Sequence, residues 1–126
     1  MAVADGTTSI LVDIISRNRL MRSGLRLLIE SRPGLIVVGE YESLRDACAL
    51  ASSVPAHVAL VDMTHESDDA LRELRSSRAR GRILVLTRQD SPGTPAIEGD
   101  VACVRIDGNN VDEVLARAIQ TVPQAP

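Results

Sequence analysis

The chain has no lysine, no phenylalanine and no tryptophan, and its 126 residues include one tyrosine and two cysteines. With almost no aromatic rings, it lacks the surfaces that stack on nucleobases. Its positive charge comes from 14 arginines against 17 acidic residues, which gives a formal net charge of −3. Nucleic-acid-binding surfaces are usually clearly basic. The composition therefore argues against direct nucleic-acid contact by this domain.

Long apolar stretches are also missing. No run approaches the roughly 20 residues that span a bilayer, and residues 1–9 lack the basic end and apolar stretch of a secretion signal. Cys48 and Cys103 lie in no metal-binding cluster, and we interpret them as small buried side chains in a reducing compartment. We expect a cytoplasmic domain that makes no membrane contact.

Five short, β-branched runs predict strands that are covered on both faces, because they are continuous rather than alternating. These runs span residues 10–15, 35–39, 57–61, 83–86 and 101–106. Helical patterns follow at about 19–31, 44–52, 68–78 and 111–122. The alternation predicts an α/β fold with a parallel sheet, in the flavodoxin-like strand order 2-1-3-4-5.

The helices differ in how clearly they show a core face. In the first, Leu20, Leu27 and Leu28 are predicted to face inward, with Gly24 allowing close approach. Ser43 is the predicted N-cap of the second. Residues 89–100 contain two prolines and two glycines, so the fourth helix of a regular repeat is expected to be degenerate. The last helix carries the cleanest apolar stripe, formed by Val111, Val114, Leu115, Ala118, Ile119 and Val122.

We divide the chain into an N-terminal tail (1–8), one domain (9–122) and the start of a linker (123–126). Open α/β sheets place their sites beyond the carboxyl ends of the strands. The predicted crevice is lined by Ser16, Arg17, Asp62, Met63, Thr64 and Thr87. The chain has no glycine-rich phosphate-binding motif and no recognisable Ser-His-Asp triad, so we do not predict an enzyme.

Four stretches together resemble the receiver domain of bacterial response regulators, in particular the NarL/FixJ type. They are residues 21–30, 37–40, 58–63 and 83–87, and the match covers about residues 9–121. The resemblance implies a flavodoxin-like fold and a role in two-component signal transduction that regulates transcription. A helix-turn-helix DNA-binding domain is then expected in the full-length protein, beyond the linker.

The resemblance also assigns individual residues. Asp62 falls on the phosphoacceptor and Thr87 on the switch hydroxyl. Thr64 falls where a backbone carbonyl binds the metal. The acidic pair that holds this metal falls on Ser16 and Arg17, so both metal carboxylates are lost.

Two further family positions also differ. The family's lysine falls near Ile106, and its proline after the acceptor falls on Glu66. We therefore expect no metal and no cofactor. Arg17 is expected either to pair with Asp62 or to point to solvent, leaving Asp62 to backbone N–H groups and water.

Several other polar residues have two readings. His65 and Arg88 are candidate ligand or lid residues near the crevice. Asp13, inside the first strand, is expected to be a buried structural acid. Arg19, Arg22 and Arg26 form a helical stripe that is either solvated or a partner contact.

The preferred interpretation is an atypical receiver that acts by dimerisation or by binding a small-molecule effector, without phosphorylation. The expected homodimer uses the first and last helices, or the last helix with the fifth strand, with Val111, Leu115 and Ile119 on its face. The alternative is a working phosphoreceiver, modified at Asp62, with a relaxed metal site. A small enzyme or carrier and a pure dimerisation module remain further possibilities.

Overall fold

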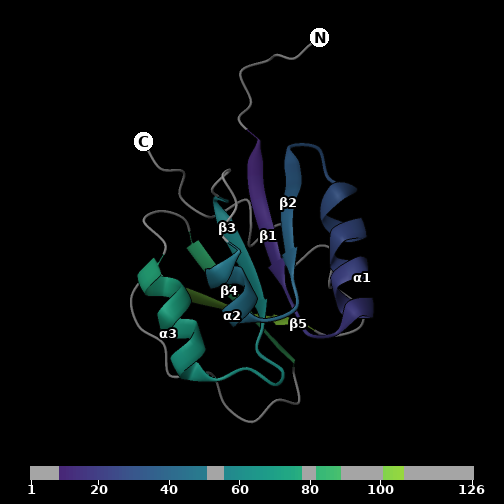
Figure 1. Ribbon diagram of the computed structural model, residues 1–126. Coiled ribbons are helices and arrows are strands. Elements are labelled where there is room, and N and C mark those ends of the chain that lie inside the picture. The colour runs from purple at the N-terminus through teal and green to yellow at the C-terminus, as the bar shows by residue number, and fades with distance from the viewer. Residues whose placement is uncertain (1–8, 51–55, 78–81, 89–100, 107–126) are drawn as a thin grey trace.

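The computed structural model describes residues 9–50, 56–77, 82–88 and 101–106. In these residues a five-stranded parallel sheet has the order β2-β1-β3-β4-β5 (Figure 1). The strands are β1 (Ile10–Ile15), β2 (Leu35–Tyr41), β3 (Val58–Asp62), β4 (Arg82–Arg88) and β5 (Val101–Ile106). The helices are α1 (Arg19–Glu30), α2 (Leu44–Ala49) and α3 (Asp68–Ser77). The predicted fold class and strand order are confirmed.

Some boundaries differ from the prediction. β2 continues two residues past the predicted end because it stays paired with β1 up to Ile15 opposite Tyr41. α2 ends at Ala49 rather than near residue 52. The predicted degenerate fourth helix (89–100) and the last helix (111–122) lie outside the described residues. Within the described part, no helix is long and apolar enough to cross a membrane.

Helices cover both faces of the sheet, α1 one face and α2 with α3 the other (Figure 1). Alternate strand residues feed the two layers, as the pleat requires. The α1 layer contains Ile10, Val12, Ile14, Leu25, Ile29, Leu35, Val58, Leu60, Leu84 and Leu86. The other contains Ile15, Leu44, Ala47, Ala59, Val61, Leu71, Leu74, Ile83 and Val85. Each fully buried Leu or Ile contributes roughly 1.5–3 kcal/mol.

The orientation of α1 corrects the prediction. The helix buries Leu25 and Ile29, and Met21 packs against the same cluster. Leu20 and Leu27 are instead 82% and 73% exposed. The sequence of α1 has two apolar stripes, one with Leu20 and Leu27 and one with Met21, Leu25 and Ile29. Packing against the sheet buries the second stripe.

Asp13 is a buried acid, as predicted, and it lies where the pairing of β1 with β2 shifts. The shift places Asp13 opposite Gly39. A Cβ added at Gly39 would come within 2.6 Å of Asp13 Oδ1 and 2.9 Å of the Tyr41 hydroxyl. Glycine therefore makes room at this point of β2 for two polar side chains.

Candidate functional site

The candidate site lies where β1 and β3 end side by side. Asp62 is the last residue of β3, and Ser16 follows β1 directly. The two strands are neighbours in the sheet and run parallel, so their carboxyl ends meet at one edge. Ser16 is fully buried and Asp62 is 6% exposed. The structure therefore brings together the acid and the hydroxyl that the sequence places 46 residues apart.

Three donors from the chain itself satisfy the Asp62 carboxylate. The Ser16 hydroxyl donates to Oδ2 at 2.8 Å. On Oδ1, the Thr64 hydroxyl donates at 2.8 Å and the Thr64 backbone N–H at 3.1 Å. A buried carboxylate needs such donors, because an unpaired charge there is costly.

Ser16 is itself fixed by its surroundings. Its backbone N–H donates to the carbonyl of Tyr41 at 3.0 Å, and its Oγ accepts from the N–H of Asn18 at 3.1 Å. Its carbonyl accepts from the Arg22 guanidinium at 2.6 Å. Arg22, predicted to face out, thus leans back from α1 with a side chain only 12% exposed. These contacts hold the Ser16 hydroxyl in the direction of Asp62.

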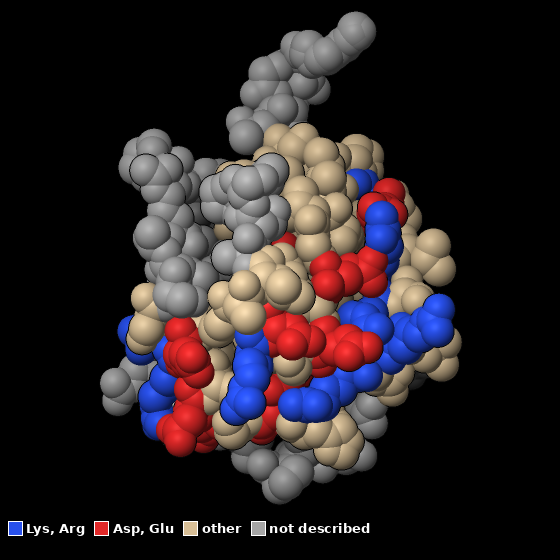
Figure 2. Space-filling view, viewed as in Figure 1, with Lys and Arg blue, Asp and Glu red and all other residues tan. Residues whose placement is uncertain are grey.

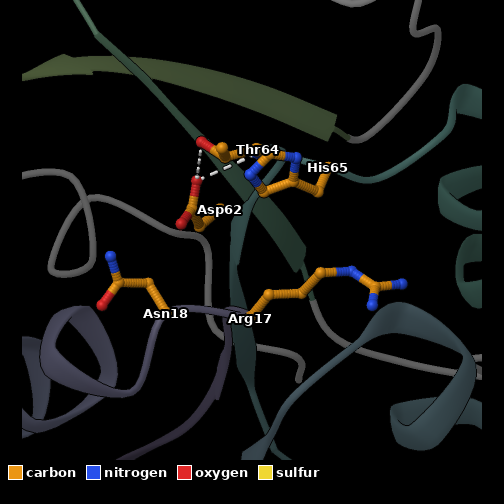
Figure 3. A pocket seen from close by; sticks show the side chains of 5 residues that line it. All are labelled: Arg17, Asn18, Asp62, Thr64 and His65. Carbon is orange, nitrogen blue, oxygen red and sulfur yellow. Dashed lines mark hydrogen bonds between the residues drawn. The ribbon is translucent and has the colours of Figure 1, made fainter.

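Arg17 does not pair with Asp62, so the first of the two expectations for it is wrong. Its side chain runs away from Asp62 (Figure 3), and its Nε lies 3.6 Å from Oε2 of Glu66. The Glu66 side chain is 3% exposed, whereas that of Arg17 is 52% exposed. The same Glu66 oxygen accepts from the N–H of Leu44 at 3.1 Å, at the start of α2. Arg17 and Glu66, two positions that differ from the family pattern, thus meet in space.

A tight turn aims Glu66 inward. The N–H of Glu66 donates to the carbonyl of Met63 at 2.9 Å, which closes the turn 63–66. His65 occupies its third position with φ of 67°. This left-handed conformation is uncommon for a residue other than glycine or asparagine. Sequence reasoning singled out His65 as a candidate lid residue and named Glu66 only as a position that differs from the family pattern, so it did not predict the contacts of Glu66.

A cavity of about 240 Å³ opens beside Asp62. It is lined by Arg17, Asn18, Asp62, Thr64 and His65 (Figure 3). Asn18 was missed at the sequence level, although its side chain caps α1 by accepting from the N–H of Met21 at 3.1 Å. The volume is below the roughly 300–1,000 Å³ of drug-sized pockets.

The backbone register places further predicted residues at the same edge. Asp62 lies opposite Leu86 in β4, so Thr87 is the next residue beyond it. Arg88 lies opposite Ile106 at the end of β5. The structure does not describe the side chains of Thr87, Arg88 and Ile106. The predicted dimer residues Val111, Leu115 and Ile119 also lie outside the described residues.

Charged side chains interleave along the edge formed by α1 and β2 (Figure 2). Arg26 contacts both Glu30 and Glu40, and Arg22 lies 4.0 Å from Glu42. The hydrogen bond that Arg26 donates to Glu40, followed by the one that it donates to Glu30, raises the pKa of the Arg26 guanidinium. Arg22 and Arg26 are therefore engaged within the chain, and Arg19 is the arginine of the predicted stripe that forms no ion pair with the described residues.

No family model matches the chain, and no curated protein matches its sequence. Solved structures do match. A LuxR-family response regulator from Aurantimonas sp. SI85-9A1 has a TM-score of 0.76 and 25% identity, covering 91% of this chain and 85% of that one. The response regulator domain of Thermotoga maritima CheB has a TM-score of 0.69 and 19% identity, covering 90% and 96%.

The Salmonella typhimurium response regulator RcsB has a TM-score of 0.70 and 20% identity over 94% of this chain. This chain spans 62% of the length of that RcsB chain. Together these likenesses show a receiver-domain fold, similar to that of LuxR-family and RcsB response regulators.

Proposed function

We propose that this chain is the receiver domain of a transcriptional response regulator and that it controls its output without aspartyl phosphorylation. The observation that carries the proposal is the state of Asp62. Its two oxygens already accept three hydrogen bonds, from Ser16 and Thr64. A phosphoacceptor needs one oxygen available for attack on phosphorus and a cation that gathers the phosphate oxygens.

The residues at the site do not fit the magnesium ion that the resemblance implies. Mg²⁺ prefers near-octahedral oxygen ligands and is usually held by one or two carboxylates together with phosphate oxygens. Among the described residues that line the cavity, Asp62 supplies the one carboxylate, and Arg17 adds a positive charge to the lining. Glu66 is turned toward Leu44 and Arg17. Among the described residues, no group of three acidic, histidine or cysteine side chains is placed to hold a metal.

The proposed output is dimerisation coupled to a DNA-binding domain. One similar structure is of two RcsB dimers bound to two parallel DNAs. By analogy, the full-length protein carries a helix-turn-helix domain and this domain brings two copies together. The net charge of −3 supports leaving DNA contact to that other domain.

A small-molecule effector is the second input that we propose, because the cavity beside Asp62 has donors on one side and a carboxylate on the other. The Arg17 guanidinium and the Asn18 amide supply the donors. A compact ligand that carries both an acidic and a basic group matches this lining. Native mass spectrometry of freshly purified protein tests for such a ligand and reports the subunit count in the same measurement.

The decisive experiment is the intact mass of the protein after incubation with acetyl phosphate and Mg²⁺. We expect no species heavier by one phosphoryl group, while a phosphorylatable response regulator treated alongside gains one. A gain that disappears in Asp62→Asn would overturn the proposal and establish the alternative, a working phosphoreceiver.

A matched variant sharpens this experiment. Combining Ser16→Asp with Arg17→Asp restores the acidic pair and removes the added cation. We expect Mg²⁺ binding by titration calorimetry in this variant and none in the parent chain. Equal binding by the two would show that the parent holds the metal through other residues.

A further inference from the structure

The outer face of α1 has an apolar stripe that the fold of the described chain leaves uncovered. Leu20 and Leu27 are 82% and 73% exposed, and Ser23 and Gly24 between them are also exposed. At 3.6 residues per turn these four positions fall on one face, opposite the buried Leu25 and Ile29. Neither the buried core nor the site beside Asp62 uses this face.

Gly24 has no role within the described structure. A Cβ added there would meet no atom within 4 Å. A glycine in the interior of an exposed helix costs about 1 kcal/mol relative to alanine. Close helix crossing is one reason for such a residue, because the distance between packed helices depends on the side chains at the contact.

The stripe is symmetric about the point between Ser23 and Gly24. From either end it runs leucine, small residue, small residue, leucine. Two copies related by a twofold axis and lying antiparallel would set Leu20 of one against Leu27 of the other, with the small residues at the crossing. A surface of this kind is self-complementary, which is the requirement of a twofold interface.

Charge supports the same arrangement. Arg19 at the start of α1 is exposed, and Glu30 ends the helix. Antiparallel pairing brings the arginine end of one helix toward the glutamate end of the other. Arg19 forms no ion pair with any residue in the described ranges, so its charge is available for this contact.

We infer that the Leu20–Ser23–Gly24–Leu27 stripe is a homodimer contact, occupied by the same stripe of a second copy of this chain. The inference rests on the proposed function in giving dimerisation a role. It goes beyond it in assigning a surface and an antiparallel orientation. One stripe on a helix of 12 residues is smaller than the roughly 1,200 Å² of a standard stable interface, so the dimer is weak and concentration-dependent unless other elements extend it.

Gly24→Leu is the most informative variant, because it changes folding and association in opposite directions. The Cβ meets open space in the monomer, and leucine is the better helix former, so the Tm of the monomer rises by about 3–6 °C. At the crossing the same side chain separates the two helices. We expect dimerisation, measured by sedimentation equilibrium, to weaken about tenfold or more.

Matched leucine variants control for the loss of apolar surface alone. Leu20→Glu and Leu27→Glu should each weaken association about tenfold, whereas Leu50→Glu should not change it. Leu50 is also strongly exposed, at 64%, but it lies after α2 and off the stripe.

Three results would overturn the inference. The parent chain is monomeric at all concentrations, or Gly24→Leu dimerises as tightly as the parent, or Gly24→Leu lowers the Tm. The last would show that the stripe is covered within the same chain. None of these results bears on phosphorylation of Asp62, so the metal-free interpretation of the site stands or falls separately.

Discussion

Two contacts join the segment after β1 to the end of β3 and the loop that follows it: a hydrogen bond, called here the Ser16 link, and an ion pair, called the Arg17 link. In the Ser16 link, a fully buried hydroxyl donates to the carboxylate of Asp62 at 2.8 Å. In the Arg17 link, a half-exposed guanidinium lies 3.6 Å from the carboxylate of Glu66. The second carries two full charges, yet water screens its exposed member, whereas both members of the first are buried. Burial, rather than formal charge, decides which link stabilises the site.

Among the variants that test this comparison, Ser16→Ala is expected to cause the largest loss in the free energy of unfolding. It removes the donor to Asp62 Oδ2 and leaves that buried oxygen unsatisfied. Hydrogen bonds to charged groups contribute about 1.5–3 kcal/mol, so we expect a loss of that size in the free energy of unfolding. Urea denaturation followed by circular dichroism measures it, with Ser76→Ala on the exposed side of α3 as control. A loss equal to the control would mean that water replaces the hydroxyl at no cost.

Thr64→Val tests the other side of Asp62 and should have an intermediate effect. The variant loses the hydroxyl donor to Oδ1 but keeps the backbone N–H that donates to the same oxygen. Because Thr64 is exposed, water can supply the missing donor, and we expect a loss of about 1 kcal/mol. Thr64→Ser, which retains the hydroxyl, should stay near the parent. If Thr64→Val lowers the free energy of unfolding more than Ser16→Ala does, burial does not determine which of the hydrogen bonds to Asp62 contributes more to stability.

The smallest effect is expected for the Arg17 link. A double-mutant cycle of Arg17→Ala and Glu66→Gln should give a coupling energy of about 0.2–1 kcal/mol, as for other partly exposed pairs. The coupling should shrink as salt is added, since the guanidinium is in contact with solvent. A coupling that exceeds the Ser16→Ala loss, or one insensitive to salt, would reverse the order of the two links.

The sequence was sufficient for the elements whose signals are local. Continuous β-branched runs located the strands, and the helical pattern predicted at about 19–31 matches α1, which ends at Glu30. The order of the strands followed from the handedness of crossovers and the resemblance to receivers. The meeting of Ser16 with Asp62 followed in turn, because adjacent parallel strands bring their carboxyl ends together.

What the sequence did not predict depends on choices made in three dimensions. A long arginine side chain selects among many rotamers, and the partner of Arg17 lies 49 residues away and is aimed by the left-handed turn at His65. The buried face of α1 was ambiguous because both sides of the helix carry leucines: Leu20 and Leu27 lie on one side, and Leu25 lies on the other. In both cases, packing against a distant segment decided between local alternatives of similar energy.

The hydrogen bond between Ser16 and Asp62 also has a consequence for how long the output of the domain lasts. An aspartyl phosphate is lost by hydrolysis, so a signal stored in one ends at the rate of that reaction. A hydroxyl held on the carboxylate by contacts of Ser16 with Asn18 and Arg22 is present in every folded copy and has no such lifetime. Under the proposed function, synthesis and degradation of the chain, together with the supply of any effector, set how long its output lasts.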